Sequence, residues 1–250
     1  MGFKQWSIRQ LPLRYHVPLR YWYRFVTRRL EREWPIVKRI IPRGHVSLDV
    51  GANNGVYTYV LSTISRRVEA FEPLPACART IAAFGARNVG VHQVALSSAN
   101  GVKELFVPQI LGTFQTSLAS FTPPRGAFET YSVPVKRLDD YGFDDVSFMK
   151  IDVEGHELEV LKGARETIAK CSPILLIEVE QRHLTFPMQG VFEYVLGLGY
   201  RGFFVIRDTV SPLMAFSSAR HQEPFLDNVL SADYINNFIF VHQSSGAWAI

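Results

Sequence analysis

The sequence predicts a doubly wound α/β domain that is preceded by a basic helical arm. From His45 onward, short apolar runs alternate with segments of helical periodicity, which is typical of helices packed on both faces of a mostly parallel sheet. The first of these runs leads into a glycine-containing turn, a feature of sheets that bind a ligand at the carboxyl ends of their strands. The 250 residues, of which 47% are hydrophobic, are enough for one sizeable core and exclude general disorder.

Charge separates the arm from the domain. Residues 1–45 contain eleven Lys or Arg and two Glu, a net charge of +9, although the net charge of the whole chain is +4. Residues 46–250 therefore carry a net charge of −5 and form a mildly acidic body, which argues against nucleic acid as a partner. We expect an arm over residues 1–45 and one domain over residues 46–250, because no Pro/Gly-rich linker interrupts the second part.

The arm is expected to form one helix between Pro18 and Pro35, a stretch without an internal helix breaker. Apolar side chains recur there at helical spacing: Leu19, Trp22, Tyr23, Val26, Leu30 and Trp34. Three arginines form a row at i, i+4 spacing: Arg20, Arg24 and Arg28. Two interpretations stay open. Either residues 19–34 lie on an anionic membrane surface, or the aromatic face packs on the domain and the arginines face water.

The sequence shows no recognisable targeting signal and has few cysteines, which favours a cytoplasmic protein. The arm would then be a contact to the inner face of the membrane. No apolar run reaches the roughly 18 residues that cross a bilayer, and arginines interrupt any secretory signal in the arm. The two cysteines, Cys77 and Cys171, are too few for a disulfide framework and are not spaced as a C-x-x-C pair.

The order of segments in the domain follows from the alternation of apolar runs and helical patterns. The first half is expected to contain a strand at Val46–Val50, a helix at Val56–Ile64, a strand at Val68–Phe71, a helix at Pro75–Gly85 and a strand at Val89–Ala95. Two further runs, Val102–Val107 and Tyr131–Val135, flank a loop rich in Gly, Ser, Thr and Pro and predict a β insertion. The second half is expected to contain a strand at Ser147–Asp152, a helix at His156–Lys170, a strand at Ile174–Glu178, a helix near Val191–Leu198 and strands at Gly202–Ile206 and Phe238–His242.

The turn after the first strand predicts a nucleoside cofactor. The chain leaves the strand at Asp49 and turns through five residues before the next helix: Gly51, Ala52, Asn53, Asn54 and Gly55. Such a turn lets a ligand approach the bare backbone. The next strand ends in Glu72, followed by Pro73, and a carboxylate at this place can accept both hydroxyls of an adenosine ribose.

The residues of this turn favour S-adenosylmethionine over a dinucleotide. A dinucleotide fingerprint needs glycine at positions 51, 53 and 56, where this chain has Gly51, Asn53 and Val56. The close approach to a pyrophosphate that those glycines permit is therefore missing. Asp49 and Asn53 instead offer acidic and polar groups, which suit the sulfonium and ammonium of S-adenosylmethionine. An NAD-dependent oxidoreductase remains the weaker alternative.

A second group of polar residues lies at the same edge of the predicted sheet. Four of them span the end of a strand and the start of a helix: Asp152, Glu154, His156 and Glu157. Glu157 is explained by the favourable interaction of acids with the start of a helix. Asp152 and Glu154 precede the helix, and Glu178 ends the next strand, so several carboxylates gather at one cleft. Such clefts are a usual place for acid/base groups.

Six motifs together resemble the FkbM family of S-adenosylmethionine-dependent methyltransferases. They are Leu-Asp-Val-Gly-Ala-Asn-Asn-Gly from residue 48, Ala-Phe-Glu-Pro from 70, Val-Ala-Leu-Ser from 94, Val-Lys-Arg-Leu-Asp-Asp from 135, Lys-Ile-Asp-Val-Glu-Gly-His-Glu from 150 and Ile-Leu-Leu-Ile-Glu-Val-Glu from 174. The resemblance runs from about Ser47 to Glu180 in family order. It implies the class I methyltransferase (Rossmann-like) fold with a mostly parallel sheet of seven strands, and methyl transfer, usually to oxygen.

The resemblance also implies roles for the cofactor residues. The amino-acid part of S-adenosylmethionine is expected at the turn with Asp49, the ribose at Glu72, and the adenine beside Ala95 and Leu96. Many relatives carry Gly-Asp after the last pair, whereas this chain has Ser97 and Ser98 and so departs from the family pattern in this loop. Asp152 is a further residue expected at the cofactor. The acceptor is expected to be a hydroxyl of a sugar, glycolipid or specialised metabolite.

A hydroxyl acceptor also needs a base. His156 is the first candidate because its ordinary pKa lies near 6.5, and Asp152 is the second. Glu154 and Glu178 complete the expected catalytic group. An alternative is that Asp152, Glu154, Glu178 and His183 bind a divalent metal that acidifies the acceptor. A membrane-associated protein of the same fold without turnover is the other alternative.

Overall fold

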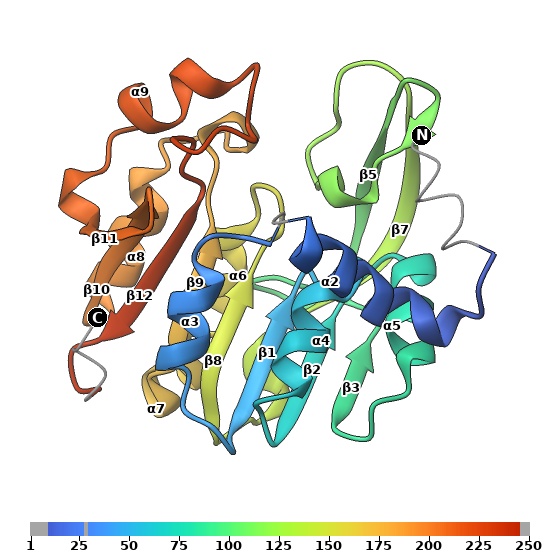
Figure 1. Ribbon diagram of the computed structural model, residues 1–250, viewed down its shortest axis with the longest axis horizontal. Helices are drawn as coiled ribbons and strands as arrows, with labels where there is room; N and C mark the ends of the chain where they lie inside the picture. Colours follow the sequence, from blue (N-terminus) through green and yellow to red (C-terminus); the bar gives the residue numbers. More distant parts are fainter. Residues whose placement is uncertain (1–9, 28–29, 246–250) are drawn as a thin grey trace.

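The computed structural model describes residues 10–27 and 30–245, which fold around a large sheet with helices on both faces (Figure 1). The sheet has the strand order β11-β10-β12-β9-β8-β1-β2-β3. Five of its strands are parallel neighbours: β3 (Val89–His92), β2 (Arg67–Phe71), β1 (Val46–Val50), β8 (Val146–Ile151) and β9 (Ile174–Glu178). Their carboxyl ends share the upper edge in Figure 1, so residues that follow these strands lie near one another.

The sheet contains eight strands, so the predicted number of seven is wrong. β12 (Asn237–His242) runs antiparallel to both β9 and β10 (Tyr200–Ile206), and β10 continues through a two-residue turn into β11 (Thr209–Pro212). Both turn residues, Arg207 and Asp208, have positive φ angles, as a tight hairpin turn requires. The sequence gives little sign of this hairpin because it uses neither glycine nor asparagine at the turn.

Helices cover both faces of the sheet. One face carries α4 (Val56–Ser62) and α5 (Pro75–Phe84), and the other carries α6 (Glu157–Gly163), α7 (Arg165–Cys171) and α8 (Gln189–Gly197) (Figure 1). The main core forms between α6, α7, α8 and the central strands, and buries residues such as Leu161, Ile168 and Val191 completely or almost so. A second core on the opposite face includes Leu61 and Val68.

One predicted helix and one predicted strand are each divided in two. The helix expected at His156–Lys170 breaks at Ala164, and Asp139 accepts hydrogen bonds from the backbone N–H groups of Glu166 (3.1 Å) and Thr167 (2.9 Å) at the start of α7. The strand expected at Val89–Ala95 ends at His92. Its last part becomes β4 (Ala95–Leu96) of a smaller sheet, with the order β4-β7-β5-β6.

The β insertion is confirmed and stands above the sheet edge. Its strands are β5 (Gly101–Ile110), β6 (Thr113–Phe114) and β7 (Phe128–Lys136). The long hairpin of β5 and β7 rises beside the carboxyl ends of β1 and β2 in Figure 1, while the segment around α9 (Ser218–His221) rises on the other side. These two parts form walls above the edge where the expected cofactor residues lie.

The arm contains two helices rather than the one predicted between Pro18 and Pro35. α2 spans His16–Val26 and α3 spans Trp34–Ile40, so both prolines occupy the first turn of a helix, where proline is tolerated. Thr27 ends α2, and its hydroxyl donates to the carbonyl of Tyr23 at 2.6 Å. Arg28, from the predicted arginine row, lies outside the described residues.

The apolar residues of the arm face in two directions. Val17 is fully buried, and the ring of Tyr21 packs against Tyr59 of α4 with 4.9 Å between centroids. On the opposite side of α2, Leu19, Trp22 and Val26 are 36%, 50% and 75% exposed. Leu19, Trp22 and Val26 therefore do not pack on the domain, whereas Leu30 and Trp34 of the same expected apolar face pack on its second core.

Candidate active site

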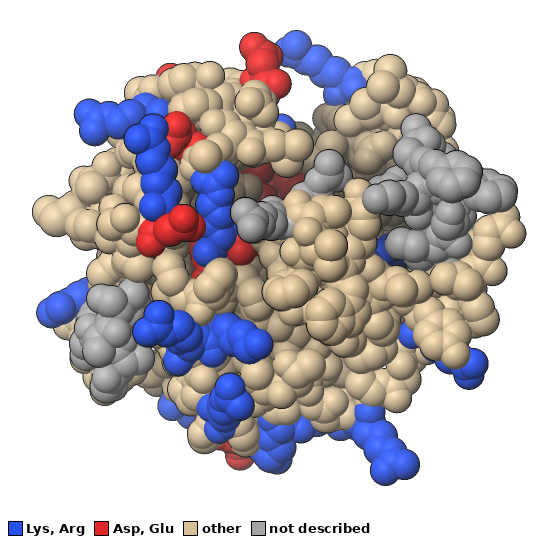
Figure 2. All heavy atoms as spheres, viewed as in Figure 1, with Lys and Arg blue, Asp and Glu red and all other residues tan. Residues whose placement is uncertain are grey.

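A cavity of about 410 Å³ opens at the carboxyl edge of the parallel strands. It is lined by the turn after β1, by Glu72 after β2, by the segment after β8, and by residues that follow β9 and precede β12. Figure 2 shows acidic side chains deep in a hollow on the upper part of the molecule. All of the residues predicted from the sequence for the cofactor and for catalysis, except Gly55, line this cavity.

The turn after β1 has its shape because glycine occupies two of its positions. Gly51 has φ of +79°, and a Cβ at this position would overlap the carbonyl oxygen of Asp152. The turn therefore lies directly against the segment after β8. Gly55, with φ of +75°, ends the turn beneath Val17 of the arm, and its N–H donates to the carbonyl of Ala52 at 2.8 Å.

Glu72 is held in one orientation by two backbone groups. Its carboxylate accepts hydrogen bonds from the N–H of Asn53 at 2.6 Å and from the N–H of Leu74 at 2.8 Å. Burial raises the pKa of Glu72 to about 7, against the lowering effect of these bonds. Each oxygen keeps a lone pair, so a fixed carboxylate beside the cavity can accept the two hydroxyls of a ribose. The following Pro73 also lines the cavity.

Asp49 lies below the turn and is only 1% exposed. Its carboxylate accepts a hydrogen bond of 2.5 Å from the hydroxyl of Thr58 in α4. Burial raises the pKa of Asp49 to about 6, which makes a nearby cation favourable. Asp49 thus fixes the helix after the turn and adds negative charge at the place where a positively charged ligand is expected.

Lys150 is a functional residue that the sequence reasoning did not single out. It is 1% exposed, and its Nζ lies 3.5 Å from a carboxylate oxygen of Asp152 and 3.5 Å from one of Glu178. Burial acts to lower the pKa of Lys150, but the surrounding carboxylates, Asp152 first, outweigh it and raise the pKa. Lys150 therefore stays charged and keeps these two carboxylates side by side on the floor of the cavity.

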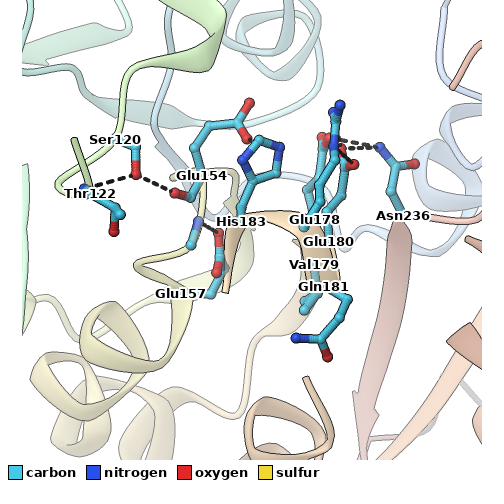
Figure 3. Close-up of polar contacts among 12 residues, drawn as sticks. Ser120, Thr122, Glu154, Glu157, Glu178, Val179, Glu180, Gln181, His183 and Asn236 are labelled. Atoms are coloured by element: carbon cyan, nitrogen blue, oxygen red, sulfur yellow. Dashed lines mark hydrogen bonds and ion pairs between the residues drawn. The ribbon is translucent and has the colours of Figure 1, made fainter. Parts of the chain in front are cut away.

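At the cavity wall, the carboxyl group of Glu154 lies beside the ring of His183, with 3.0 Å between Oε2 and Nε2. Glu154 has a positive φ of 49°, and the next residue, Gly155, packs so closely on the backbone of His183 that a Cβ there would overlap its carbonyl oxygen. Burial, and then the nearby Asp152 and Glu180 carboxylates, raise the pKa of Glu154 to about 9. Figure 3 shows the two side chains pointing toward each other.

Across from this pair, a network of polar groups connects the ends of β9 and β12 (Figure 3). The amide of Asn236 donates to Glu178 at 2.7 Å and to Glu180 at 3.4 Å. Arg182 donates to Glu180 at 2.5 Å and 3.2 Å, and the hydroxyl of Tyr234 donates to the same carboxylate. All of these groups line the cavity. A single sequence gave no sign of Tyr234 and Asn236, because neither belongs to a motif.

His156 lies near Ala95 and Leu96, on the side of the cavity where adenine is expected. Its Nε2 is 3.0 Å from the hydroxyl of Ser97, and its ring meets the edge of Phe121 with 4.7 Å between centroids. Burial, with a smaller effect of Lys103, lowers the pKa of His156 to about 4. A neutral imidazole with so low a pKa is a weak base at neutral pH. Its assignment as the base stays a prediction that this environment does not favour.

The alternative of a divalent metal receives no geometric support. Within residues 10–27 and 30–245, no three or more His, Cys, Asp and Glu side chains are arranged to hold a metal ion. Of the four residues considered, Glu154 and His183 lie against each other, while Asp152 and Glu178 share Lys150. In the same described part of the chain, no helix has the length and apolar character needed to cross a membrane.

The buried carboxyl groups predict how stability depends on pH. The pKa values of Glu72 and Glu157 are raised to about 7, and that of Asp49 to about 6, all mainly by burial. At these three groups the folded state therefore binds more protons than the unfolded chain between about pH 4.5 and pH 7. Each group stabilises the fold fully below its unfolded pKa, and this contribution is lost as the pH rises through the folded pKa.

We expect the free energy of unfolding of the ligand-free protein to fall between pH 5 and pH 8, by up to about 1.4 kcal/mol per pH unit for each such carboxyl. Urea unfolding at both pH values measures this. Glu72→Gln removes one of the titrating groups and should make the difference smaller. Stability that rises over this range would contradict the expectation.

Comparison with known proteins gives a family match over most of the domain. The model of the methyltransferase FkbM domain matches residues 49–201. A comparison of the sequence with curated proteins finds no match. Among solved structures, the chain is similar to a methyltransferase FkbM from Methylobacillus flagellatus, with a TM-score of 0.51 and 19% identity. That similarity covers 79% of this chain and 43% of the other, so this chain spans less than half the length of that protein.

Two further solved structures have lower TM-scores. One is a SAM-dependent methyltransferase from Aquifex aeolicus, with a TM-score of 0.43, 15% identity, and coverage of 96% of this chain and 98% of the other. The second is a Streptococcus mutans protein in complex with SAH, with a TM-score of 0.47, 10% identity, and coverage of 83% and 94%.

Proposed function

Because the chain belongs to the FkbM methyltransferase family, we propose that it methylates a hydroxyl oxygen of a small acceptor, such as a sugar, a glycolipid or a specialised metabolite. S-adenosylmethionine is its cofactor and supplies an electrophilic methyl group when bound. The observation that carries the proposal is the partly buried Glu154, a carboxyl with a raised pKa at the wall of the cavity. A hydroxyl acceptor needs such a base, since it must lose a proton when its oxygen is methylated.

The residues present fit S-adenosylmethionine. The turn at Gly51–Asn54 offers bare backbone, the Glu72 carboxylate offers two acceptors in a fixed position, and Asp49 adds negative charge. Ala95 and Leu96 provide an apolar wall on which an adenine ring can lie. The cavity volume of about 410 Å³ lies in the usual range of small-molecule sites. We assign the turn and Asp49 to the amino-acid part, Glu72 to the ribose, and Ala95 and Leu96 to the adenine.

The acceptor end of the cavity is then the side with Glu154, His183 and the Glu180 network. Hydrogen-bond acceptors and donors lie together there: carboxylates, the amide of Asn236, the guanidinium of Arg182 and the hydroxyl of Tyr234 all line the cavity. A surface rich in both donors and acceptors suits an acceptor with several hydroxyls. Leu230, which is 89% exposed, lines the mouth of the same cavity and offers an apolar contact for an acceptor with a lipid or other hydrophobic part.

Glu154 is the proposed general base, and His183 is the residue that positions it. The contact with the His183 ring and the close packing of Gly155 on the backbone of His183 hold the Glu154 side chain in one place. A carboxylate with a raised pKa is a stronger base than an ordinary one, so proton transfer from an alcohol is more favourable. Lys150 keeps Asp152 and Glu178 from moving toward Glu154, since it pairs with both. Most of the rate should come from the alignment of acceptor and methyl group.

Labelled methyl groups provide the test of this proposal. The purified protein would be incubated with methyl-labelled S-adenosylmethionine and panels of glycans, glycolipids and polyhydroxylated metabolites. We expect label in a product that survives mild alkaline hydrolysis, as a methyl ether does and a methyl ester does not. Transfer only to amines or carboxylates would refute methylation of a hydroxyl. Cofactor binding without transfer to any class would favour the alternative of a protein without turnover.

We further propose that α2 contacts an anionic membrane surface from one side. Leu19, Trp22 and Val26 form an exposed apolar stripe, with Phe25 (52% exposed) beside it. The arm that carries them has a net charge of +9 over residues 1–45. An exposed apolar stripe on a strongly basic segment matches the chemistry of a lipid surface with negative headgroups. A glycolipid acceptor would then be presented to the cavity from that surface.

The triple change Leu19→Ser, Trp22→Ser and Val26→Ser is expected to weaken binding to phosphatidylglycerol-containing vesicles by about tenfold or more, because the apolar area that enters the lipid is lost. Vesicle flotation measures the bound fraction. Met214→Ser, which changes a 91% exposed residue outside the arm, serves as the control. Binding should also decrease with added salt and disappear on neutral vesicles. Unchanged flotation of the triple variant would remove the stripe as the contact.

A further inference from the structure

The charge of the cavity raises the question of how the cofactor carboxylate is held. Seven of the residues that line the cavity are acidic: Glu31, Asp49, Glu72, Asp152, Glu154, Glu178 and Glu180. This excess suits the sulfonium and ammonium of S-adenosylmethionine. The methionine part also ends in a carboxylate, and a carboxylate placed among other carboxylates is strongly disfavoured unless a cation accompanies it.

Three Lys or Arg residues among the described residues line the cavity: Arg24, Lys150 and Arg182. Lys150 is already shared by Asp152 and Glu178 at 3.5 Å each. Arg182 donates two hydrogen bonds to Glu180. Arg24, in contrast, forms no ion pair with any residue in the described part of the chain. It is therefore the cation at this cavity that remains available to a ligand.

The position of Arg24 follows from the packing of α2. Val17, Tyr21 and Arg24 are spaced i, i+4 and i+7 and therefore share one face of the helix. Val17 lies against Gly55, since a Cβ there would be 3.3 Å from its methyl groups, and Tyr21 packs on Tyr59. This face of α2 thus rests on the end of the turn and on the helix that follows it.

Arg24 continues the same face and reaches the cavity. The residues of the turn and of the start of α4 that line the cavity with it include Asn54, Val56 and Tyr57. It also lines a smaller cavity together with Leu30 and Glu31 of the arm. Arg24 is thereby placed at the end of the cavity to which the turn belongs.

We propose that Arg24 binds the carboxylate of the methionine part of S-adenosylmethionine, so that the arm completes the cofactor site. The inference rests on the cofactor placement given under the proposed function. A guanidinium can donate two parallel hydrogen bonds to a carboxylate, which gives orientation as well as charge neutralisation. The arm then contributes one of its arginines to the cofactor and presents its apolar stripe on the opposite side of the same helix.

Two nucleosides that differ only in the amino-acid part test the inference. S-adenosylhomocysteine carries the carboxylate, whereas 5′-methylthioadenosine lacks both carboxylate and ammonium. Calorimetric titration of the full chain with each probe should show that Arg24→Met weakens S-adenosylhomocysteine binding about tenfold, because a charge-assisted contact is lost. Binding of 5′-methylthioadenosine should change by less than about twofold. Arg24→Lys should give an intermediate loss, since it keeps the charge but not the two-point contact.

Two controls separate this inference from the proposal on which it rests. Arg39→Met removes an exposed arginine from α3 of the same arm, outside the cavity, and should leave both affinities unchanged. Glu72→Ala should weaken both probes, and retention of both would overturn the cofactor placement itself. Loss of both probes in Arg24→Met, with an unchanged melting temperature, or unchanged S-adenosylhomocysteine binding would overturn the role of Arg24.

Discussion

Glu72→Gln is expected to weaken S-adenosylhomocysteine binding by on the order of 100-fold, because two hydrogen bonds from the ribose to a charged acceptor are lost or weakened. The structure gives the reason for so large an effect. Both carboxylate oxygens already accept backbone N–H groups, from Asn53 and Leu74, and so point in fixed directions. An amide NH2 in place of one oxygen would face one of these donors and one ribose hydroxyl at once. Calorimetric titration measures the loss.

The pH dependence of the affinity for S-adenosylhomocysteine provides a second test of Glu72. Since burial raises the pKa of Glu72 to about 7, the group is largely protonated at pH 6 and largely ionised at pH 8. Ribose hydroxyls donate better to the ionised form, so the affinity of the wild-type protein should rise over this interval. Glu72→Gln should remove this rise. Glu69→Gln, a change in the strand that precedes Glu72 but outside the cavity, should preserve it.

An affinity of Glu72→Gln equal to that of the wild type would show that the ribose does not contact Glu72. The placement of all three parts of the cofactor would then have to be reversed or shifted. A loss that is equal at pH 6 and pH 8 would instead keep the contact but remove the role of its ionisation.

Most of the sheet could be predicted because the parallel strands are short runs in which apolar residues predominate. β1 and β9 coincide with their predicted ranges, as both are buried on two faces. The errors arise where contacts distant in sequence decide. Ala95 and Leu96 continue an apolar run but pair with β7, and Ala164 interrupts a helical pattern where Asp139 binds the next turn. Neither the pairing with β7 nor the break at Ala164 is indicated by the neighbouring residues in the sequence.

The site could be predicted to the extent that it follows the ends of parallel strands. Asp49, Glu72 and Asp152 meet because β1, β2 and β8 are neighbours in the sheet. Lys150 had a signal that was not used: a lysine inside the run Phe-Met-Lys-Ile is predicted to be buried and therefore to need carboxylate partners. Arg24 had none, since its place depends on how α2 packs on α4 across more than thirty residues of chain.

The change with the largest expected effect on turnover is Glu154→Gln. We expect kcat to fall by about 10² to 10³, in the range found when a general base is removed, while the affinity for S-adenosylhomocysteine changes by less than about threefold. The amide keeps the size of the side chain and its contact with His183, but it cannot accept a proton. Glu166→Gln, in which a largely exposed glutamate of α7 is changed, is the matched control for the same substitution.

The pH profile distinguishes a base from a residue that merely shapes the site. Burial and neighbouring carboxylates raise the pKa of Glu154 to about 9, and the group must lose its proton to act. Turnover of the wild-type protein should therefore rise from neutral to alkaline pH. Glu154→Gln should lose this rise along with the rate. If Glu154→Gln lowers the rate but turnover still increases with pH, another group accepts the proton. His156 would not explain that result, because its pKa of about 4 would place the increase in the acid range.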